Sequence, residues 1–449
     1  MKKKEIVELI TTGEHDKVKV AIADLDGILR GKYMQRDKFI SALDAGFGFC
    51  DVVFGWDSSD KEYALGKVTG GHTGFPDGMA TIDAESMREI PWEQDLPFFL
   101  ADFSADKKRS AVCPRSLLKR IISEAVKSGY QPYFAQEFEW FNFEETPHSI
   151  REKGYRDLKS LTPGMFGYSL LRTSMENEFM HDLFESMNFF GIPLEGLHTE
   201  TGPGVYEAAI EYSGALEAAD RAVLFKAGTK EIAYQHGILA TFMAKWNIAL
   251  PGCSGHVHQS LWDDKENLFF DGKDKQKMSP IMRSYIAGQL HCLPHILPML
   301  APTVNSYKRL SGGAWAPSTV SWGIDNRTVA LRCLPVSAKA CRLETRVPAS
   351  DTNPYLAIAA CLASGLYGIK KKLKLDQPET KGSAYAAKNL RHLPNNLQKA
   401  TGLMRDSDVA KELFGETFVD HFCMTREHEW SQFSTQVTDW ELQRYLEII

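Results

Sequence analysis

Hydrophobic residues along this chain follow two rhythms, one of about three to four residues and one of about two. The longer rhythm predicts helices, which are expected at residues 1–13, from Pro114 onward, and at 170–190, 218–240, 280–300 and 353–372, with a mostly helical remainder. The shorter rhythm predicts a hairpin over 17–33, strands at 131–143, 242–250 and 256–262, and a strand–turn–strand unit over 194–212. Residues 146–163 read as a polar loop. Because strands and helices mix without strict alternation, an α+β fold is favoured over a doubly wound sheet.

A change in the sequence pattern near residue 105 predicts a domain boundary. Short strand-like segments and glycine-rich turns continue to about residue 104, and a polar, charged cluster follows at 105–110. The chain of 449 residues is long enough for more than one domain. We therefore expect a small sheet-based domain at 1–106 and a larger domain at 107–449.

Composition narrows the class of protein. Hydrophobic residues make up 43% and charged residues 24%, which is typical of a soluble globular protein. The formal net charge of −6 and the lack of a basic tail argue against a nucleic-acid partner. The apolar windows are too short or too polar to span a bilayer, and Glu5, Glu8 and Glu14 interrupt any signal peptide. Eight cysteines without a CxxC pair fit reduced thiols in a cytoplasmic protein.

Basic residues gather in residues 305–346, although the whole chain is acidic. This stretch holds five arginines and two lysines against only Asp325 and Glu344. Its arginines are interleaved with apolar residues, and the alternation around Leu331 suits a strand that shows one face to a cleft. Guanidinium groups on such strands need anions to face, because an unpaired buried charge is costly. The anions are either the carboxylates of the chain itself or a substrate that carries phosphate and carboxylate groups.

Carboxylates and imidazoles recur in four short patterns. Residues two apart in a strand point to one face, so the ExE at 137–139 and the HxH at 256–258 each present two side chains together. An HTE sequence at 198–200 is followed by Glu207 across a Gly-Pro-Gly turn, and Glu344 lies between Arg342 and Arg346. Each pattern alone also fits a solvated strand face. Together they are mostly oxygen ligands with one or two imidazoles, which suits Mg²⁺ or Mn²⁺.

Several other chemistries lack their required residues. A zinc deaminase would need a PCxxC partner for the HxE sequence, and a metal-dependent amidohydrolase would need further ligands in an eightfold strand–helix repeat. Neither a GxxxxGK[ST] phosphate loop nor a GxSxG nucleophile elbow occurs. A divalent cation beside an arginine cluster is typical of phosphoryl transfer from ATP.

The order of these sequences resembles the glutamine synthetase family. The matching segments are CPRSLLKRI, ExE, HTE…E, GHVHQSL, NSYKRL, NRTVALR, RLETR and NPYLAIAA, and the resemblance covers about residues 15 to 449. It implies an N-terminal β-grasp domain and a catalytic domain built on an antiparallel-sheet funnel flanked by helices. It also implies ATP as co-substrate, two or three Mg²⁺ or Mn²⁺ ions per site, and a two-step reaction in which glutamate forms γ-glutamyl phosphate and a nitrogen nucleophile then displaces phosphate.

The resemblance also implies a role for individual residues. One metal ion would be held by Glu139, Glu200 and Glu207, and a second by Glu137, His256 and Glu344. Glutamate would be bound by Gly252, Arg309 and Arg346, and Arg327 would face the transferred phosphoryl group. The ATP side would consist of Glu195, His198, His258, Ser260, Arg332, Lys339 and Arg342.

Two departures from the family concern the nitrogen donor. Ammonium-using members carry a glutamate in a flap sequence where this chain reads SGGAWAP, which places Trp315 at that position. Tryptophan cannot accept a proton, but its ring suits an alkyl or aryl group or an ammonium head. The family aspartate of the ammonium site aligns with Asp57 only after a one-residue shift. We count Asp57 and Trp315 with Arg309 and Arg327 as catalytic candidates, and the changes favour a glutamate–amine ligase that makes a γ-glutamylamide.

Three alternatives stay open at this point. The chain could be a true glutamine synthetase with a shifted proton acceptor, a non-catalytic structural relative, or a ligase for an acid other than glutamate. The six metal positions are all Glu or His, which disfavours the non-catalytic reading. Arg391 replaces the adenylylated tyrosine of the family in KNLRHLP, so that regulation is not expected. The resemblance further implies a homo-oligomeric dodecamer of two stacked hexameric rings, in which Asp57 would serve the site of the adjacent chain.

Overall fold

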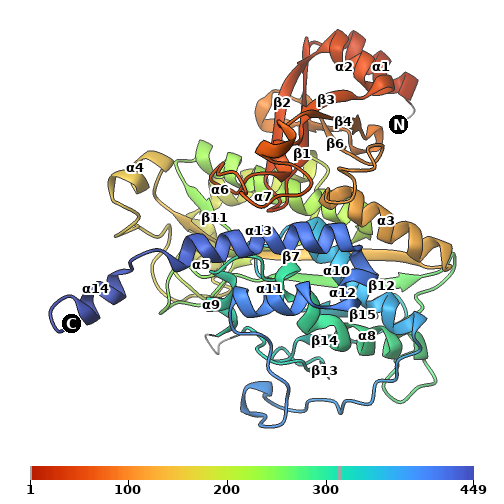
Figure 1. Ribbon diagram of the computed structural model, residues 1–449, viewed down its shortest axis with the longest axis vertical. Helices are drawn as coiled ribbons and strands as arrows, with labels where there is room; N and C mark the ends of the chain where they lie inside the picture. The colour runs from red at the N-terminus through yellow and green to blue at the C-terminus, as the bar shows by residue number, and fades with distance from the viewer. Residues whose placement is uncertain (1–2, 312–314) are drawn as a thin grey trace.

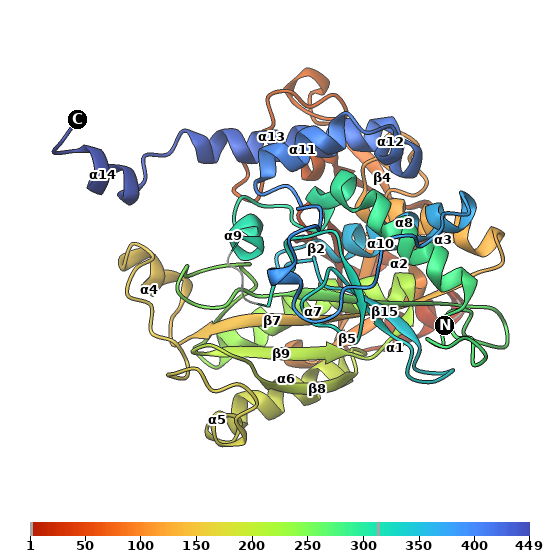
Figure 2. The same cartoon turned by 90° about the horizontal axis from the view of Figure 1, so that it is seen from below.

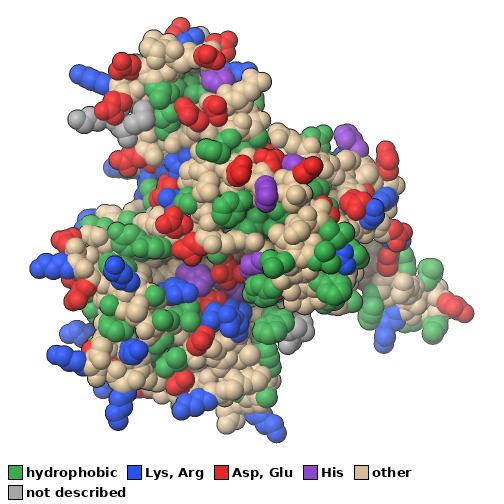
Figure 3. Space-filling model, turned by 180° about the vertical axis from the view of Figure 1, so that it is seen from behind, with side chains coloured by type: hydrophobic (Ala, Val, Ile, Leu, Met, Phe, Trp, Pro, Cys, Tyr) green, Lys and Arg blue, Asp and Glu red, His purple; other side chains and the backbone are tan. Residues whose placement is uncertain are grey.

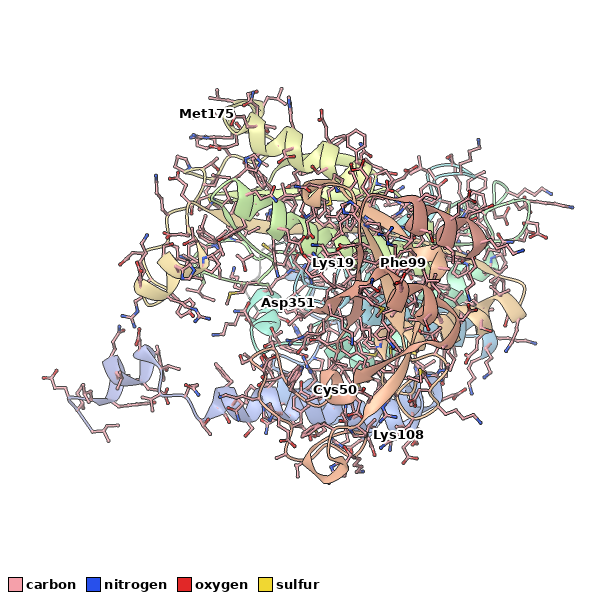
Figure 4. All side chains as sticks on the ribbon, turned by 90° about the horizontal axis from the view of Figure 1, so that it is seen from above. Lys19, Cys50, Phe99, Lys108, Met175 and Asp351 are labelled. Carbon is pink, nitrogen blue, oxygen red and sulfur yellow. The ribbon has the colours of Figure 1, made fainter. Side chains whose placement is uncertain are left out.

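The N-terminal part of the protein is built on a six-stranded sheet. The computed structural model describes residues 3–311 and 315–449. The sheet order is β2-β1-β6-β4-β3, with β5 paired to β6 and with β1 and β6 parallel. The elements are α1 (Lys3–Thr12), β1 (Lys17–Ala23), β2 (Leu29–Gln35), α2 (Arg36–Ala45), β3 (Phe47–Cys50), β4 (Asp77–Ile82), β5 (Arg88–Ile90) and β6 (Leu96–Asp102). Helix α2 packs on this sheet, and the Phe39 ring lies 4.7 Å from that of Phe99. Figure 4 labels Phe99 within this region, whereas Met175 lies at the periphery.

A nine-stranded sheet forms the centre of the larger part of the molecule. Its order is β13-β14-β15-β12-β7-β9-β8, and β10 and β11 also pair with β7. The strands are β7 (Gln131–Phe143), β8 (Leu194–Thr199), β9 (Val205–Ile210), β10 (Ser213–Gly214), β11 (Leu239–Thr241), β12 (Gly255–Trp262), β13 (Trp322–Ile324), β14 (Leu331–Leu334) and β15 (Arg342–Thr345). All pairs except β13 with β14 are antiparallel.

Helices cover this sheet and link it to the N-terminal part (Figure 1). They are α3 (Pro114–Lys127), α4 (Pro147–Glu152), α5 (Leu170–Met175), α6 (Asn177–Phe189), α7 (Ala215–Gln235), α8 (Pro280–Ile296), α9 (Ser306–Leu310), α10 (Pro354–Lys370), α11 (Leu397–Arg405), α12 (Asp408–Phe414), α13 (Glu416–Ser434) and α14 (Asp439–Tyr445). The α10 helix is buried against α3, α7 and α8, and α14 extends away from the body of the molecule (Figure 2). Across residues 3–311 and 315–449, no helix has both the length and the apolar character needed to cross a bilayer.

A buried ion cluster joins the two parts. Arg115 of α3 donates to Asp83 and to Asp102, each at 2.8 Å, and to Asp220 of α7 at 2.7 and 2.9 Å. Tyr355 of α10 donates to the same Asp220 carboxylate at 2.7 Å. One arginine thus ties the N-terminal sheet to three helices of the larger part.

Most of the predicted elements are present, and the α+β class is confirmed. The strand at 131–143 and the hairpin over 17–33 form as predicted, and all eight cysteines are free thiols. The predicted helix 170–190 is interrupted at Glu176, whose ψ of 30 divides it into α5 and α6. The predicted loop 146–163 contains the short helix α4, which begins at a Thr146 capping box. The helix expected to reach residue 240 ends at Gln235, because Gly237 takes a positive φ of 69. The division at residue 106 stays a prediction.

The prediction of a strand at 242–250 is wrong. The chain pairs with β7 only at 239–241 and then continues as a loop. Phe242 and Trp246 still turn inward, against Trp140 and Phe143 respectively. The backbone is held by Asn305, whose side chain bonds to both the N–H and the C=O of Lys245. Burial of alternate aromatic rings therefore produced a strand-like pattern without a ladder of backbone hydrogen bonds.

Candidate active site

Strand register brings the acidic and imidazole side chains onto one face of the nine-stranded sheet. Glu137 of β7 lies opposite His256 of β12, and His258 lies opposite Glu344 of β15. On the other side of β7, Glu139 lies opposite Glu207 of β9, which in turn lies opposite His198 of β8. Directly opposed residues share a face, so the patterns predicted from separate segments form one site. Figure 3 shows acidic, histidine and basic side chains gathered in a hollow at the centre of one face of the molecule.

One group of ligand atoms surrounds Glu137 and Glu344. The His256 Nδ1 atom lies 2.9 Å from Glu137 Oε1 and 3.4 Å from Glu344 Oε1. The His258 Nε2 atom lies 3.4 Å from the other Glu137 oxygen, and ligand atoms of Glu137, His258 and Glu344 lie within 4.8 Å of one another. The predicted set of Glu137, His256 and Glu344 is therefore brought together, and His258 joins it.

A second group lies across β7. Ligand atoms of His198, Glu200 and Glu207 lie within 4.8 Å of one another. Glu139 borders this group, but one of its carboxylate oxygens accepts the Ser254 N–H at 2.5 Å. The structure thus adds His198 to the three predicted carboxylates of this group.

The carboxylates of the two groups are short of positive charge. Burial and the nearby charges of Glu137, Glu139 and Glu200 raise the pKa of Glu207 to about 10. Burial also raises the pKa of Glu139. Burial alone would raise the pKa of Glu137, but hydrogen bonds from His256 and His258 outweigh it and hold that pKa well below its usual value.

The donor set fits hard divalent cations. Burial and the charge of Arg346 lower the pKa of His256 to about 4, which keeps this imidazole neutral at pH 7. The buried Nε2 atom of His256 has no hydrogen-bond partner among the residues that the structure describes. Neutral imidazole nitrogens beside carboxylates that repel one another suit a Mg²⁺ or Mn²⁺ site better than they would suit a metal site with thiolate ligands.

The arginines divide into two kinds. Arg332 pairs with Glu344 at 2.8 Å and with Asp325 at 2.6 Å, and Arg346 pairs with Glu344. These two follow the expectation of internal ion pairs. Arg309 is buried, and among the described residues it donates only to backbone carbonyls, those of Arg346 at 3.2 Å and Val347 at 2.9 Å. Its charge therefore stays available for an external carboxylate.

Gly252 packs directly on Arg309. A Cβ at this position would come within 2.8 Å of Arg309 Cγ and 2.6 Å of the Ala244 carbonyl oxygen. A side chain at position 252 would clash with both atoms, so glycine is needed for the backbone to pack this close to the arginine.

A cavity of about 360 Å³ opens beside the first ligand group. Glu137 and His258 form its inner wall, and Ser260, Glu195, Lys339 and Arg342 line it as well. Arg342 Nε donates to His258 Nδ1 at 3.2 Å. The outer wall is aromatic, because the Tyr133 ring lies 6.1 Å from that of Tyr212 and 5.9 Å from that of Trp262. Five residues predicted on the ATP side therefore share one cavity.

Two tyrosines at the site were not predicted from the sequence. Tyr168 stacks on His198 with ring centres 4.4 Å apart, and the charges of Glu200, Glu207 and Arg327 act on its phenol. Tyr385 lies in a segment joined to the loop of Arg327, because Thr328 Oγ1 accepts the Ala384 N–H at 2.9 Å. Burial raises the pKa of Tyr385, while Arg346, Arg309 and a hydrogen bond with the Trp315 backbone oppose the increase. Tyr168 has a left-handed φ of 55, a feature of the folded chain that the sequence does not reveal.

Trp315 and Asp57 differ in their relation to the site. Trp315 has a φ of 61 and an exposed fraction of 60%, and its backbone meets the phenol of Tyr385. The preceding flap residues 312–314 lie outside the described residues. Asp57 accepts backbone N–H groups of Ser59 and Lys61, and its other oxygen lies 3.3 Å from His428 of α13. Within the described chain, it has no hydrogen bond or ion pair with the two ligand groups.

Comparison with known proteins decides the family. A model of the glutamine synthetase catalytic domain matches residues 111–445. This chain belongs to the glutamine synthetase family. Members of the glutamine synthetase family are carbon–nitrogen ligases that use ATP and divalent metal ions, so the predicted enzyme class is confirmed.

Relatives within the glutamine synthetase family carry different names. The chain is 53% identical over 438 residues to type-1 glutamine synthetase 2 of Dictyostelium discoideum, covering 96% of this chain and 84% of that one. It is 37% identical over 440 residues to a glutamate–isopropylamine ligase of a Pseudomonas species, covering 97% and 95%. It is 34% identical over 446 residues to a gamma-glutamylethanolamide synthetase of Streptomyces coelicolor, covering 99% and 95%.

Solved structures of the glutamine synthetase family confirm the fold. A complex of GmaS with ADP matches with a TM-score of 0.84 and 26% identity, covering 98% of this chain and 99% of that one. The predicted combination of an N-terminal β-grasp domain and a glutamine-synthetase-type catalytic domain is therefore correct.

Proposed function

We propose that this ligase joins the γ-carboxylate of glutamate to an organic amine, with ATP as the source of energy. In the first step a carboxylate oxygen bonds to the γ-phosphorus as the bond to ADP breaks. In the second step the amine nitrogen bonds to the carbon of the γ-carboxyl group, the bond from that carbon to phosphate breaks, and the amine loses a proton. The observation that carries the amine assignment is Trp315, which stands where ammonium-using relatives carry a glutamate.

The nucleotide is assigned to the cavity beside Glu137. Tyr133, Tyr212 and Trp262 offer aromatic faces for a purine ring, and Lys339 and Arg342 supply positive charge for phosphate oxygens. Glu195, His198, His258, Ser260 and Arg332 complete this side of the site. Because Glu137 and His258 line the same cavity, the inner end of a nucleotide placed there would meet the first ligand group.

Two divalent cations are assigned to the two ligand groups. One would be held by Glu139, Glu200 and Glu207, and the other by Glu137, His256 and Glu344. When bound, such cations neutralise the charge of phosphoryl oxygens and hold the reactants in line. Glu207 would release its proton on binding, because its pKa of about 10 keeps it protonated in their absence.

Glutamate is assigned to the side of the site beyond β15. Arg309 and Arg346 would bind its carboxylates, and the bare backbone of Gly252 would contact it beside Arg309. Arg327 would face the transferred phosphoryl group from the loop to which the Tyr385 segment is joined. Positioning by these charges supplies much of the catalysis in reactions that lack a covalent enzyme nucleophile.

The amine is assigned to the space bounded by Trp315, Tyr385 and Tyr168. The phenol of Tyr385 contacts the backbone of Trp315, and Arg309 and Arg346, which are assigned to glutamate, lie near this phenol. Tyr168 lies on the opposite side, over His198. Aromatic faces bind alkyl groups and alkylammonium heads, whereas none of these side chains is a carboxylate for free ammonium.

Glutamine synthesis is the second candidate. The relative with 53% identity is named as a glutamine synthetase, which favours ammonium as the nitrogen donor. The relatives at 37% and 34% identity are named for isopropylamine and ethanolamide products. Identity alone therefore does not separate the two candidates, and the assignment to an organic amine rests on Trp315.

We further propose that the active form is a ring of subunits, as in stacked hexamers. Asp57 lies away from the ligand groups of its own chain, on a loop that contacts α13. In such a ring, Asp57 of one subunit would reach the amine side of the active site in the neighbouring subunit.

The test is phosphate release from ATP with Mg²⁺ and glutamate. Methylamine, isopropylamine, ethanolamine, putrescine and aniline are compared with ammonium, and reactions without glutamate serve as the control. One amine with a kcat/KM at least about tenfold above that of ammonium supports the proposal, since this corresponds to about 1.4 kcal/mol of discrimination. Preference for ammonium would establish the second candidate instead.

A further inference from the structure

A second cavity, of about 600 Å³, lies at the base of the segment that carries Trp315. Both ends of that segment line it, with Leu310 and Ser311 before and Ser318 after. Residues 391–395 and Lys399 of α11 also line it, and residues 391–393 pair with residues 318–320 through backbone hydrogen bonds. None of the residues assigned to ATP, glutamate, metal or amine lines this cavity.

The lining of this cavity is positively charged. Arg391, His392 and Lys399 face it, and no Asp or Glu is among its lining residues. Within residues 3–311 and 315–449, neither Arg391 nor Lys399 makes an ion pair. Ser311, Ser318 and Asn395 add hydroxyl and amide donors. A cavity with cations, donors and no carboxylate is suited to an anion.

The start of α11 adds to this preference. The helix has nine residues, and Asn396 caps it by accepting the Lys399 N–H at 2.8 Å. Its first turn therefore carries Lys399 on the cavity wall, at the end of the helix dipole that favours negative charge. A guanidinium fork and an ammonium across one cavity match the oxygens of a tetrahedral oxyanion.

Backbone bonds connect the segment of Arg391 to the segment after Trp315, and the chain itself connects the cavity to the glutamate site. Arg391 C=O accepts the Val320 N–H at 2.8 Å, and Ser318 C=O accepts the Leu393 N–H at 2.9 Å. On the other side, Leu310 follows Arg309 in the five-residue helix α9. A ligand in this cavity thus lies beside Leu310, the residue next to a glutamate arginine, and beside Ser318 in the segment after Trp315.

We propose that this cavity is a regulatory site for a tetrahedral oxyanion, such as the phosphate group of a small metabolite. Binding is linked to glutamate binding through α9, and linkage requires that each ligand change the affinity of the other by the same factor. The proposal does not depend on which nitrogen donor the enzyme uses.

Anion binding is tested with the full-length enzyme and selenate. In crystals, the anomalous signal of selenium is expected between Arg391 and Lys399, in addition to any peak in the ATP site. In solution, sulfate is titrated at constant ionic strength. The double variant Arg391→Ala/Lys399→Ala is expected to lose this site and to weaken its sulfate affinity by about tenfold or more. The control Lys127→Ala/Arg151→Ala removes the same charge from exposed positions and should bind normally.

Regulation is tested with the same variants. In the unmodified enzyme and in the control, saturating sulfate should change the KM for glutamate by about threefold or more, the low end of typical coupling. The Arg391→Ala/Lys399→Ala enzyme should keep its basal KM, unfold at the same temperature and lose this response. Inorganic phosphate and glycerol phosphate, used as second probes, distinguish a free ion from a phosphate ester.

Two results would overturn the proposal. Sulfate affinity that is unchanged in the double variant, or reduced equally in the control, would remove the site. Binding in the cavity without any change in the glutamate KM would mean an adventitious ion only. If no nitrogen donor supports turnover, the glutamate affinity is measured by calorimetry with ADP and with or without sulfate. Failure of the proposed ligase reaction is then distinguished from failure of the regulatory site.

Discussion

Two buried clusters of charge in this protein have opposite electrostatics. Around Arg115, each of the three aspartates accepts a hydrogen bond from the guanidinium, and Lys119 adds a further cation at 2.7 Å from Asp102. Around Glu137 and Glu207, the chain supplies more carboxylates than cations, and the pKa of Glu207 rises to about 10. The charges of the first cluster are paired within the chain, whereas the carboxylates of the second would be neutralised by the proposed cations.

This contrast separates charge that holds the fold from charge that does chemistry. In the Arg115 cluster burial would raise the pKa of Asp83, yet Arg115 and Lys119 outweigh it and lower that pKa to about 2. Ionised aspartates there stabilise the folded state. In the ligand groups, the folded chain holds carboxylates that repel one another close together, which costs free energy, and the proposed cations would offset that cost on binding. Four predictions follow the contrast, from the largest effect to the smallest.

Replacing Glu207 should abolish activity and leave the fold intact. Glu207→Gln is nearly isosteric with the protonated acid, so the free energy of unfolding without metal should not fall. Phosphate release should fall by about three orders of magnitude, equivalent to about 4 kcal/mol of activation free energy. Glu211→Gln, just beyond the end of β9 and exposed, is the matched control and should be as active as the parent. If Glu207→Gln keeps more than a tenth of the parent activity, its activation free energy has risen by less than about 1.4 kcal/mol, and the assignment is contradicted.

Replacing Arg115 should have the opposite result. Arg115→Met leaves the buried Asp102 and Asp220 and the partly buried Asp83 without their shared partner, which is expected to cost about 3–5 kcal/mol of unfolding free energy. Urea unfolding measures this loss, and activity per folded molecule should persist. Lys119→Met is the control, since its half-buried ammonium should cost much less. Equal losses in the two variants would show that the cluster does not depend on the central guanidinium.

Acid should weaken the Arg115 cluster. A carboxyl whose folded pKa is depressed stabilises the protein above its unfolded pKa of about 4 and loses that contribution as pH falls. For Asp83 the loss should run from about pH 4 to about 2, its folded pKa. The unfolding free energy of Arg115→Met should therefore decline less steeply over this range than that of the parent. Parallel curves for the two proteins would remove the cluster as the cause.

Adding a carboxylate on the amine side should change the nitrogen donor. Trp315→Glu introduces an anion where free ammonium could be bound and deprotonated. The ratio of kcat/KM for ammonium to that for the preferred amine should rise by about tenfold, or about 1.4 kcal/mol. Trp315→Phe keeps an aromatic face and serves as the control. An unchanged ratio in Trp315→Glu would place the proton acceptor elsewhere.

The sequence predicted the parts of the site that depend on strand periodicity. Side chains two apart in β7 and β12 had to share a face, and the order of the segments matched one family, so most of the residues that the structure brings together in the two groups were among those predicted. Tyr168 and Tyr385 were missed because they meet the site only through tertiary packing, from loops without a periodic pattern. The strand predicted at 242–250 failed for the same reason, since Asn305, 60 residues from Lys245, holds that backbone.

A competition between two nitrogen donors tests the central claim most directly. The enzyme receives glutamate, ATP and Mg²⁺ with equal concentrations of ammonium and the best amine of the panel, and mass spectrometry measures the two products. The account predicts that the γ-glutamylamide exceeds glutamine by about tenfold or more. Glutamine as the main product would contradict it and assign the site with Trp315 to ammonium.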